Sequence, residues 1–425
     1  MSTSTSTVAV RPWEEIVQRL YDLMEKNDWI LNFNQAIADA KRANVPDLDE
    51  INDLTDYLND INEFLFWKPT ENERGDKVYN KICLFYWFLE QRTILVLQSE
   101  VLPNQADRPL TILSNWMVDY ANSLGAFYDT EASINAETIE TFYNSPPYKM
   151  DQYERPSDDW KTFNEFFARH VKPGLRPPDD PENPEVIVSG ADSVFDGKWS
   201  VDDENQVFFV KGVPWNIKDL LKDSDYADRF KGGTFMHSFL NTTDYHRQHA
   251  PVPGTIVEAK VIQGAAYLEV VLVTDPDSAK DGQEARNTFA MRRCMTAGMT
   301  DANIIRHEYR GIPGSEPTSK QARGLNAPDT PGYQFLQARG CIIIDSPIGL
   351  VAMLPVGMAQ VSSVRLSVNK GDQVKKGQEV SYFQFGGSDY ILVFEAGSGV
   401  DITAKEGTHY LTGQQIGTGK VPTLG

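Results

Sequence analysis

Residues 341–354 read Cys341-Ile-Ile-Ile-Asp345-Ser-Pro-Ile-Gly-Leu350-Val-Ala-Met-Leu354. Two short apolar runs flank a Pro/Gly turn, a pattern that predicts two neighbouring strands. Similar runs begin at about residue 186: Val186–Val188, Val207–Val210, Thr255–Val261, Tyr267–Val273, Cys341–Asp345, Leu350–Leu354, Val361–Val368, Glu379–Phe385 and Tyr390–Phe394. We therefore expect a mostly β domain with a few helices over residues 186–425.

The first 150 residues have a helical pattern instead. Apolar residues near the start of the chain follow the i, i+4, i+7, i+8 spacing of one helix face: Ile16, Leu20, Leu23 and Met24. Longer apolar segments predict buried helices over 77–98 and 108–124. We expect a helical N-terminal extension over residues 1–150, and hence an α+β fold.

Two polar segments interrupt this plan. Residues 151–185 are rich in proline and acidic residues, enclose a short predicted helix over Thr162–His170, and are the best linker candidate. Residues 275–332 are polar and rich in Gly, Pro and Asp, which predicts an insertion or a mobile loop.

Composition limits the possible partners and compartments. With 60 Asp+Glu against 40 Lys+Arg, the net charge of −20 argues against nucleic acid and against an anionic membrane surface. The most apolar run, Ile82–Leu97, is interrupted by Glu90-Gln91-Arg92 and is too short for an integral membrane segment. The three cysteines show no disulfide or zinc spacing, and the N-terminus shows no secretory signal, so we expect a cytoplasmic protein.

Two histidines lie together in Asp244-Tyr-His246-Arg-Gln-His249-Ala-Pro-Val-Pro-Gly254. Their i, i+3 spacing can place both imidazoles on one side of a turn, where they suit proton transfer near neutral pH. A zinc site is an alternative, although the spacing is not that of the H-E-x-x-H motif. A purely structural role also remains open for this pair.

A candidate nucleophile lies in Phe385-Gly386-Gly387-Ser388-Asp389-Tyr390, because the two glycines leave the serine sterically open. The bland alternative is an ordinary hairpin turn between two strands. A third segment, Val188-Ser-Gly-Ala-Asp192-Ser-Val-Phe-Asp196, contributes acidic residues after a strand. Together the three segments supply an acid, a base and a hydroxyl, but only geometry identifies a catalytic triad.

In combination and in this order, four stretches resemble the phosphatidylserine decarboxylase family. They are Phe163–Arg169 with Lys172–Gly174, the Asp192 loop, Tyr245–Gly254, and Gly371–Gly377 leading into Tyr382–Ser388. The resemblance covers about residues 160–396, with a weak match over 265–335. The helical N-terminal region looks like the extension of a soluble fungal branch that includes an L-tryptophan decarboxylase.

The resemblance implies a self-cleaving enzyme with a covalent pyruvoyl cofactor, no pyridoxal phosphate and no metal. Ser388 would attack the carbonyl of Gly387, splitting the chain into 1–387 and 388–425 and leaving the pyruvoyl group at the new N-terminus. Asp192 would orient His249 as the base for Ser388. The substrate amine would form a Schiff base, carbon dioxide would leave, and His246 would return a proton. The two chains would stay associated, and a homodimer is expected.

Some positions depart from the family pattern or serve as second candidates. Asp389 follows the serine where most relatives carry Ser or Thr, so its carboxylate either repels the developing oxyanion or faces away from it. Asp196 is the reserve for Asp192, and His237 is a supporting candidate near the histidine pair. Gly386 belongs to the cleavage turn.

Three functions follow from these observations. Acidic charge and the absence of an anchor favour a small substrate, an aromatic L-amino acid such as Trp, Tyr, DOPA or Phe. The core motifs favour phosphatidylserine as the alternative substrate. An unprocessed, non-catalytic binding protein is the third, if Asp389 blocks cleavage. Residues Gly371–Gln378 also resemble the turn of biotinyl and lipoyl carrier domains, but Lys375 and Lys376 lie in the wrong turn for modification.

Overall fold

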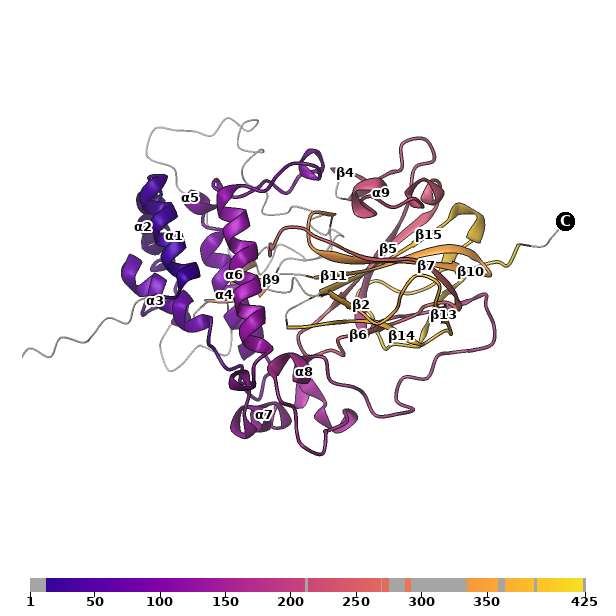
Figure 1. The fold of residues 1–425 in the computed structure, drawn as a ribbon, viewed down its shortest axis with the longest axis horizontal. Coiled ribbons are helices and arrows are strands. Elements are labelled where there is room, and N and C mark those ends of the chain that lie inside the picture. Colours follow the sequence, from indigo (N-terminus) through magenta and orange to yellow (C-terminus); the bar gives the residue numbers. More distant parts are fainter. Residues whose placement is uncertain are drawn as a thin grey trace, which may run out of the picture.

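The computed structural model describes residues 13–210, 213–268, 270–274, 287–291, 335–357, 364–385 and 388–422. Helices fill most of the chain before residue 170, and strands dominate after residue 186. In Figure 1 the helices stand as a layer on one side and the strands form a separate layer beside it. This arrangement confirms the α+β class expected from the sequence.

Nine α-helices occur in the described residues: α1 Glu15–Lys26, α2 Ile30–Ala40, α3 Leu54–Phe64, α4 Lys77–Leu89, α5 Arg92–Leu95, α6 Ile112–Tyr128, α7 Ala136–Tyr143, α8 Phe163–Phe167 and α9 Ile217–Leu220. Side-chain caps fix several of their starts, because they satisfy backbone N–H groups that have no partner within the helix. Asn135 and Thr138 form a capping box at α7, and Thr162 caps α8. These short helices therefore begin where their sequences specify.

The most apolar segment is two helices and not one. The expected helix over 77–98 is wrong in its length, since α4 ends at Leu89 and α5 begins at Arg92. Glu90 lies at the break, where its carboxylate accepts a hydrogen bond of 2.7 Å from the backbone of Val270. The side chains of α4 are buried on nearly every face of the helix, as expected for a helix inside a core. Within the described residues, no helix has the length and apolar character needed to cross a bilayer.

The described strands are β1 Val186–Val188, β2 Ser193–Ser200, β3 Val207–Val210, β4 Val213–Asn216, β5 Thr234–Leu240, β6 Arg247–His249, β7 Gly254–Ile262, β8 Val270–Thr274, β9 Asn287–Met291, β10 Arg339–Ser346, β11 Gly349–Gly357, β12 Val364–Leu366, β13 Gln373–Val374, β14 Glu379–Phe383, β15 Ser388–Phe394, β16 Asp401–Ile402, β17 His409–Tyr410 and β18 Gln415–Thr418. The largest sheet has the order β13-β7-β10-β11-β15-β5-β2-β17. Two three-stranded sheets, β1-β18-β16 and β12-β14-β6, and the ribbons β3-β4 and β8-β9 complete the β layer.

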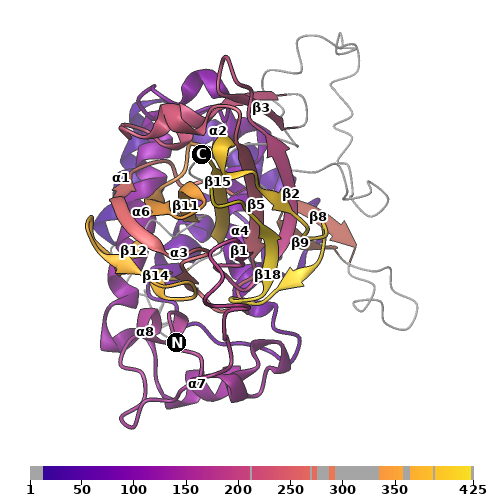
Figure 2. The ribbon, with the colours of Figure 1, turned by 90° about the vertical axis from the view of Figure 1, so that its right-hand side faces the viewer.

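The sequence pattern misses two strands of the large sheet: β5, which pairs with β15, and β2, which pairs with the other edge of β5 (Figure 2). Each contains polar or charged residues that hide its strand character, such as Asp196 in β2 and His237 in β5. Both faces of the sheet are nonetheless buried. Ile391 and Val393 of β15 face one apolar core, and Leu392 faces the core that includes the N-terminal helices.

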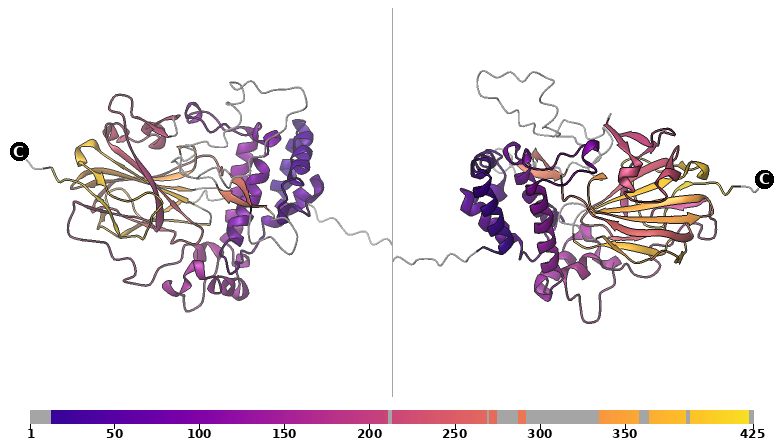
Figure 3. Two further views of the ribbon diagram at one scale, coloured as in Figure 1. Left: turned by 180° about the vertical axis from the view of Figure 1, so that it is seen from behind. Right: turned by 45° about the horizontal axis from the view of Figure 1, so that its top comes forward.

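The helical layer lies against one end of the strands, and the last described residues, in yellow, lie on the side of the molecule away from the helices (Figure 3). The β8-β9 ribbon joins the two layers: β9 packs on α4, and the backbone of Asn287 donates to the carbonyl of Asn44 at 3.0 Å. Part of the loop expected over 275–332 is therefore strand, namely 287–291. The remainder of that segment lies outside the described residues.

Candidate active site

Ser388 is the first residue of β15, an interior strand of the eight-stranded sheet. It lies opposite Gly357 of β11 and Leu240 of β5. The preceding strand β14 belongs to a different sheet, so the hairpin alternative for this segment is wrong. Gly386 and Gly387 lie outside the described residues, and only the backbone of Ser388 is described. The expected cleavage position thus lies where the chain enters a strand paired on both sides.

The residues just before that position are held by the helical layer. The backbone N–H of Phe385 donates to Oδ1 of Asn164 at 3.0 Å, and Nε2 of Gln384 donates to Oδ1 of Asp129 at 3.0 Å. Asn164 also donates to the same Asp129 oxygen at 2.8 Å. Three rings surround Phe385 at centroid distances of 4.8, 5.2 and 5.5 Å: Tyr128, Phe163 and Phe167. These contacts fix the chain on the N-terminal side of the Gly387–Ser388 bond.

Sequence reasoning does not single out Asn164 or Asp129. The one available signal is a polar Asn inside the aromatic run Phe163–Phe167. Asn164 is buried, and a buried amide is normally fully hydrogen-bonded. Its partners, however, lie far away in the sequence and emerge only from the fold.

His249 is held in one tautomer by two partners. Its Nδ1 lies 2.8 Å from the carbonyl oxygen of Gly377, and its Nε2 lies 3.1 Å from the hydroxyl of Tyr245. A carbonyl can only accept, so Nδ1 carries the proton and Nε2 keeps its lone pair. Burial lowers the pKa of His249 below its ordinary value. The imidazole is therefore neutral at pH 7, in the form that can accept a proton.

His246 is fully buried, and its ring stacks on Phe167 at a centroid distance of 3.9 Å. Burial, and then the positive charge of Arg169, lower its pKa well below the ordinary range. Neither ring nitrogen has a hydrogen-bond partner within the described part of the chain. Because Phe167 also contacts Phe385, this unsatisfied imidazole is one ring away from the expected cleavage segment.

Asp192 is buried and bound to a residue other than the one expected. The guanidinium of Arg176 contacts both carboxylate oxygens, at 2.6 to 3.0 Å, and the backbone of Thr412 donates to Oδ1 at 2.8 Å. Both ring nitrogens of His249 have other partners, so the structure does not bring Asp192 into direct contact with it. The negative charge of Asp192 nevertheless acts on His249 across space and favours its protonated form.

The second candidates Asp196, His237 and Asp389 meet in the interior. Nδ1 of His237 lies 3.1 Å from Oδ2 of Asp196, and Nε2 lies 3.1 Å from Oδ1 of Asp389. Burial alone would lower the pKa of His237, but the two carboxylates outweigh it and raise the pKa to about 9. The ring is therefore a cation at neutral pH.

Gly190 lies where the Asp192 loop meets the strand of His249. Its carbonyl accepts a hydrogen bond of 2.7 Å from the backbone N–H of His249. A Cβ at this position would lie 2.2 Å from the hydroxyl of Tyr390 and 2.4 Å from the carbonyl of His249. The second contact is with backbone, which cannot easily give way.

Gly190→Ala is therefore expected to lower the free energy of unfolding by about 1–3 kcal/mol, through overpacking. It should also slow any reaction that depends on His249. Gly125→Ala in α6 is the matched control, because its Cβ would meet nothing within 4 Å. Chemical denaturation of both variants measures the difference. Equal stabilities would contradict the tight approach at Gly190.

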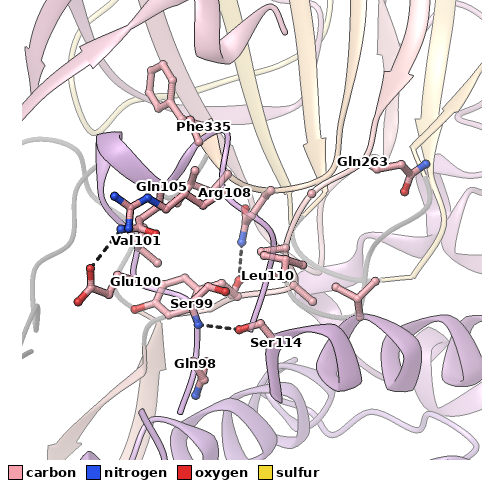
Figure 4. Close-up of a pocket in the computed structure, with 18 of the residues that line it drawn as sticks. Gln98, Ser99, Glu100, Val101, Gln105, Arg108, Leu110, Ser114, Gln263 and Phe335 are labelled. Atoms are coloured by element: carbon pink, nitrogen blue, oxygen red, sulfur yellow. Dashed lines mark hydrogen bonds between the residues drawn. The ribbon is translucent and has the colours of Figure 1, made fainter. Parts of the chain in front are cut away.

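Two hollows border this region. One of about 310 Å³ lies between residues of the segment Gln98–Leu110 and residues of two further segments, Gln263–Tyr267 after β7 and Phe335–Arg339 at the start of β10. Figure 4 shows it, with the backbone of Ser99 bonded to Ser114 along its floor. The other, of about 190 Å³, is lined by Tyr128, Asp129, Asn164, Arg365, Gln384 and Phe385, among others. The smaller hollow touches the residues that precede the cleavage position.

Comparison with known proteins identifies the family. The family model described as phosphatidylserine decarboxylase matches residues 163–418, which is more than half of the chain. The chain belongs to the phosphatidylserine decarboxylase family. Members of this family are pyruvoyl-dependent carboxy-lyases, and their pyruvoyl group is made from a serine of the chain. The matched segment begins at α8 and includes every site residue predicted from the sequence, whereas Tyr128 and Asp129 precede it.

Several relatives are similar over the same part. Phosphatidylserine decarboxylase proenzyme 3 of Schizosaccharomyces pombe is 30% identical over 64% of this chain and 22% of its own length. The proenzyme of Fusobacterium nucleatum is 30% identical over 61% of this chain and 68% of its own. Decarboxylase iboD of Amanita muscaria is 27% identical over 67% of this chain and 75% of its own. The chain thus spans about a fifth of the S. pombe relative.

The residues around position 388 fit such a cofactor. The orphaned ring nitrogens of His246 lie one aromatic ring from Phe385 and are available to a buried polar group at that position. When present, a pyruvoyl group would accept the electron pair of the bond between the substrate Cα and its carboxyl carbon as carbon dioxide leaves. His246, His249 and the anchored residues 384–385 are the parts of this chain that would surround it.

The carrier-domain resemblance has a different explanation. Nζ of Lys376 donates to the carbonyls of Asp180 at 2.7 Å and Asn183 at 2.6 Å. The side chain is buried and satisfies backbone oxygens of the segment before β1. Lys376 is therefore a structural residue that ties this turn to the rest of the domain.

Proposed function

We propose that the chain cleaves itself between Gly387 and Ser388 and then decarboxylates a small aromatic L-amino acid. The observation that carries this proposal is the position of Ser388 at the start of a paired interior strand. Asn164 anchors Phe385, three residues earlier, and β6 supplies a neutral His249. Family membership supplies the reaction type.

In the cleavage step, His249 removes the hydroxyl proton of Ser388 through Nε2, and the oxygen attacks the carbonyl carbon of Gly387. The acyl group moves from nitrogen to oxygen, so an ester replaces the amide. Loss of the Cα proton of residue 388 then expels the Gly387 carboxylate. Water replaces the nitrogen of residue 388, which leaves as ammonia, and a ketone remains at the new N-terminus. Asp192, held by Arg176, acts on His249 by charge.

The two products would remain associated for a structural reason. The short chain 388–425 begins with β15, which is hydrogen-bonded to β11 and β5 on either side. Its side chains fill both apolar cores. Breaking one peptide bond at the end of this strand leaves that pairing and packing in place.

Three observations support a small aromatic substrate. The rings of Tyr128, Phe163, Phe167 and Phe385 form an aromatic wall beside the cleavage segment. The hollow of about 190 Å³ next to it carries both Asp129 and Arg365, opposite charges that suit a zwitterion. The net charge of −20 disfavours approach to anionic bilayers.

Cys83 and Cys341, buried without a disulfide, support the cytoplasm as the compartment.

Phosphatidylserine is the second candidate substrate, because the relatives in S. pombe and F. nucleatum are named phosphatidylserine decarboxylase proenzymes. The two candidates are separable by product. Processed enzyme incubated with Trp, Tyr, DOPA or Phe should release the corresponding aromatic amine, and phosphatidylserine vesicles should give little phosphatidylethanolamine. Phosphatidylethanolamine as the main product, together with activity-linked vesicle binding, would overturn the aromatic proposal.

Intact-mass spectrometry under denaturing conditions tests the cleavage itself. The wild-type chain should give two fragments, 1–387 and 388–425, and the smaller should be lighter by one ammonia than the product of simple hydrolysis. Ser388→Ala should give one uncut chain with no decarboxylase activity. A wild-type chain that stays uncut would overturn the proposed function and leave a binding protein blocked at Asp389.

A further inference from the structure

Three ionisable residues from three adjacent strands meet in the interior of the sheet: Asp196 of β2, His237 of β5 and Asp389 of β15. The His237 and Asp389 side chains are fully buried, and Asp196 is 8% exposed. Each imidazole nitrogen lies 3.1 Å from a carboxylate oxygen, Nδ1 from Asp196 and Nε2 from Asp389. Ordinary cores exclude such groups because burying charge is costly.

Strand pairing brings Asp196 to this point, beside a β-bulge. On β2, Val194 pairs with Phe239 and Phe195 pairs with Ser238, and the next regular partner of His237 is Asp196. The bulge lies at this residue, because Gly197 also pairs with His237 and Asp196 is the extra residue. Bulges are common beside functional sites.

The third member directly follows the proposed cleavage bond. Asp389 lies on the face of β15 that it shares with Ile391 and Val393, opposite to the face of Tyr390. Within the described residues its carboxylate accepts no hydrogen bond, although Nε2 of His237 is at ion-pair distance. The positive ring is therefore what offsets the burial of this carboxylate.

We propose that His237 is a positioning residue for self-cleavage, which holds the Asp389 carboxylate on the far face of β15 and offsets its charge next to the reacting bond. This inference rests on the proposed function. An unopposed carboxylate one residue from Ser388 would disfavour the anion that forms when the hydroxyl attacks Gly387. The contact has a second use after cleavage, when Asp389 becomes the second residue of the short chain. It then ties the new chain end to β5 of the long chain.

The charge state of His237 gives the proposal a pH signature. The titratable groups acting on the ring are Asp389 from β15 and Asp196 from β2, and together they raise its pKa to about 9. The ring loses its proton as pH rises through that value, which leaves two buried carboxylates with no cation between them. The cleavage rate of the wild-type chain should therefore fall above about pH 9.

A double-variant cycle tests the proposal. The variants are Asp389→Ser, which removes the carboxylate, His237→Val, and the pair His237→Val/Asp389→Ser. Cleavage at Gly387–Ser388 is followed by intact mass from pH 6 to pH 10, with the thermal midpoint measured alongside. His237→Val should slow cleavage at least about tenfold at pH 7, since it leaves Asp389 unopposed. The double variant should recover most of that loss and show no fall near pH 9.

The outcomes are distinct. A purely structural role would change thermal midpoints and lower the rate equally at every pH, and the double variant would be slower than either single one. That result, or a His237→Val variant with the wild-type rate and pH profile, would overturn the inference while leaving self-cleavage intact. If His237→Val does not fold, Asp389→Asn keeps the shape and removes the charge, and it should abolish the fall near pH 9. An uncut wild-type chain overturns both this inference and the proposed function.

Discussion

The His249→Gln variant is expected to remain one uncut chain while the wild-type protein cleaves itself. Glutamine keeps a polar group of similar reach but cannot accept the hydroxyl proton of Ser388 at neutral pH. General-base catalysis contributes about 10²–10⁴-fold, so cleavage should slow at least about 100-fold. The fraction of uncut chain, followed over time by denaturing electrophoresis and intact mass, measures the effect.

Two controls make this result specific. His170→Gln carries the same substitution at a side chain that is 54% exposed, and it should cleave at the wild-type rate. Tyr245→Phe removes the hydroxyl 3.1 Å from Nε2 but keeps the base, so its effect should be much smaller than that of His249→Gln. If the His249→Gln variant cleaved itself at the wild-type rate, another group would have to activate Ser388.

The pH dependence of cleavage follows from the same histidine. Burial lowers the pKa of His249, so the base form is complete above its ordinary value near 6.5 and is lost only below it. The rate should therefore be flat near neutrality and fall on acidification. With the loss expected above about pH 9 from His237, the full profile should be bell-shaped.

The Arg176→Met variant is expected to lose about 3–5 kcal/mol of unfolding free energy, because it strands the buried Asp192 carboxylate. Both side chains are less than a tenth exposed, at 6% and 3%, so water cannot replace the lost partner. The pair Arg176→Met/Asp192→Asn should recover a large part of that loss. Asparagine carries no charge and can still accept the bond from the Thr412 backbone. Denaturant titration of the three proteins measures the changes.

The surface pair Arg19–Asp119 is the matched control. Its side chains are 45% and 50% exposed, so Arg19→Met should lower the free energy of unfolding by less than about 1 kcal/mol.

The cleavage rate of the Arg176→Met/Asp192→Asn variant then reports on the role of the Asp192 carboxylate itself. We expect it to be slower than wild type but faster than His249→Gln. A stable double variant as inert as His249→Gln would show instead that the Asp192 carboxylate is indispensable, as in a direct triad.

Much of the architecture is readable from local patterns. The helical extension, the β-rich remainder and the strands around residues 341–354 follow from residue periodicity and Pro/Gly turns, which act over a few neighbours. The errors occur where polar residues enter buried elements. Strands β2 and β5 contain Asp196 and His237, and their strand character depends on pairing with each other and not on their own composition.

The site shows the same division. The motifs around Ser388, His249 and Asp192 predict the family that the comparison shows, and they predict Ser388 as its reactive serine, because those signals lie within short stretches of chain. The hydrogen-bond partners of these residues are not predictable from the motifs. Arg176, which binds Asp192, belongs to a segment predicted only as a linker. Asn164 of α8 binds the backbone of Phe385, more than 200 residues away in the sequence.

Position 389 is the clearest case. The sequence shows an acidic residue after the serine and leaves open whether it repels the reaction or faces away from it. The pairing of β2, β5 and β15 decides the matter, because it places two carboxylates beside the same imidazole. Composition and motif spacing cannot specify such a contact, because it depends on the register of three strands that are brought together only when the chain packs.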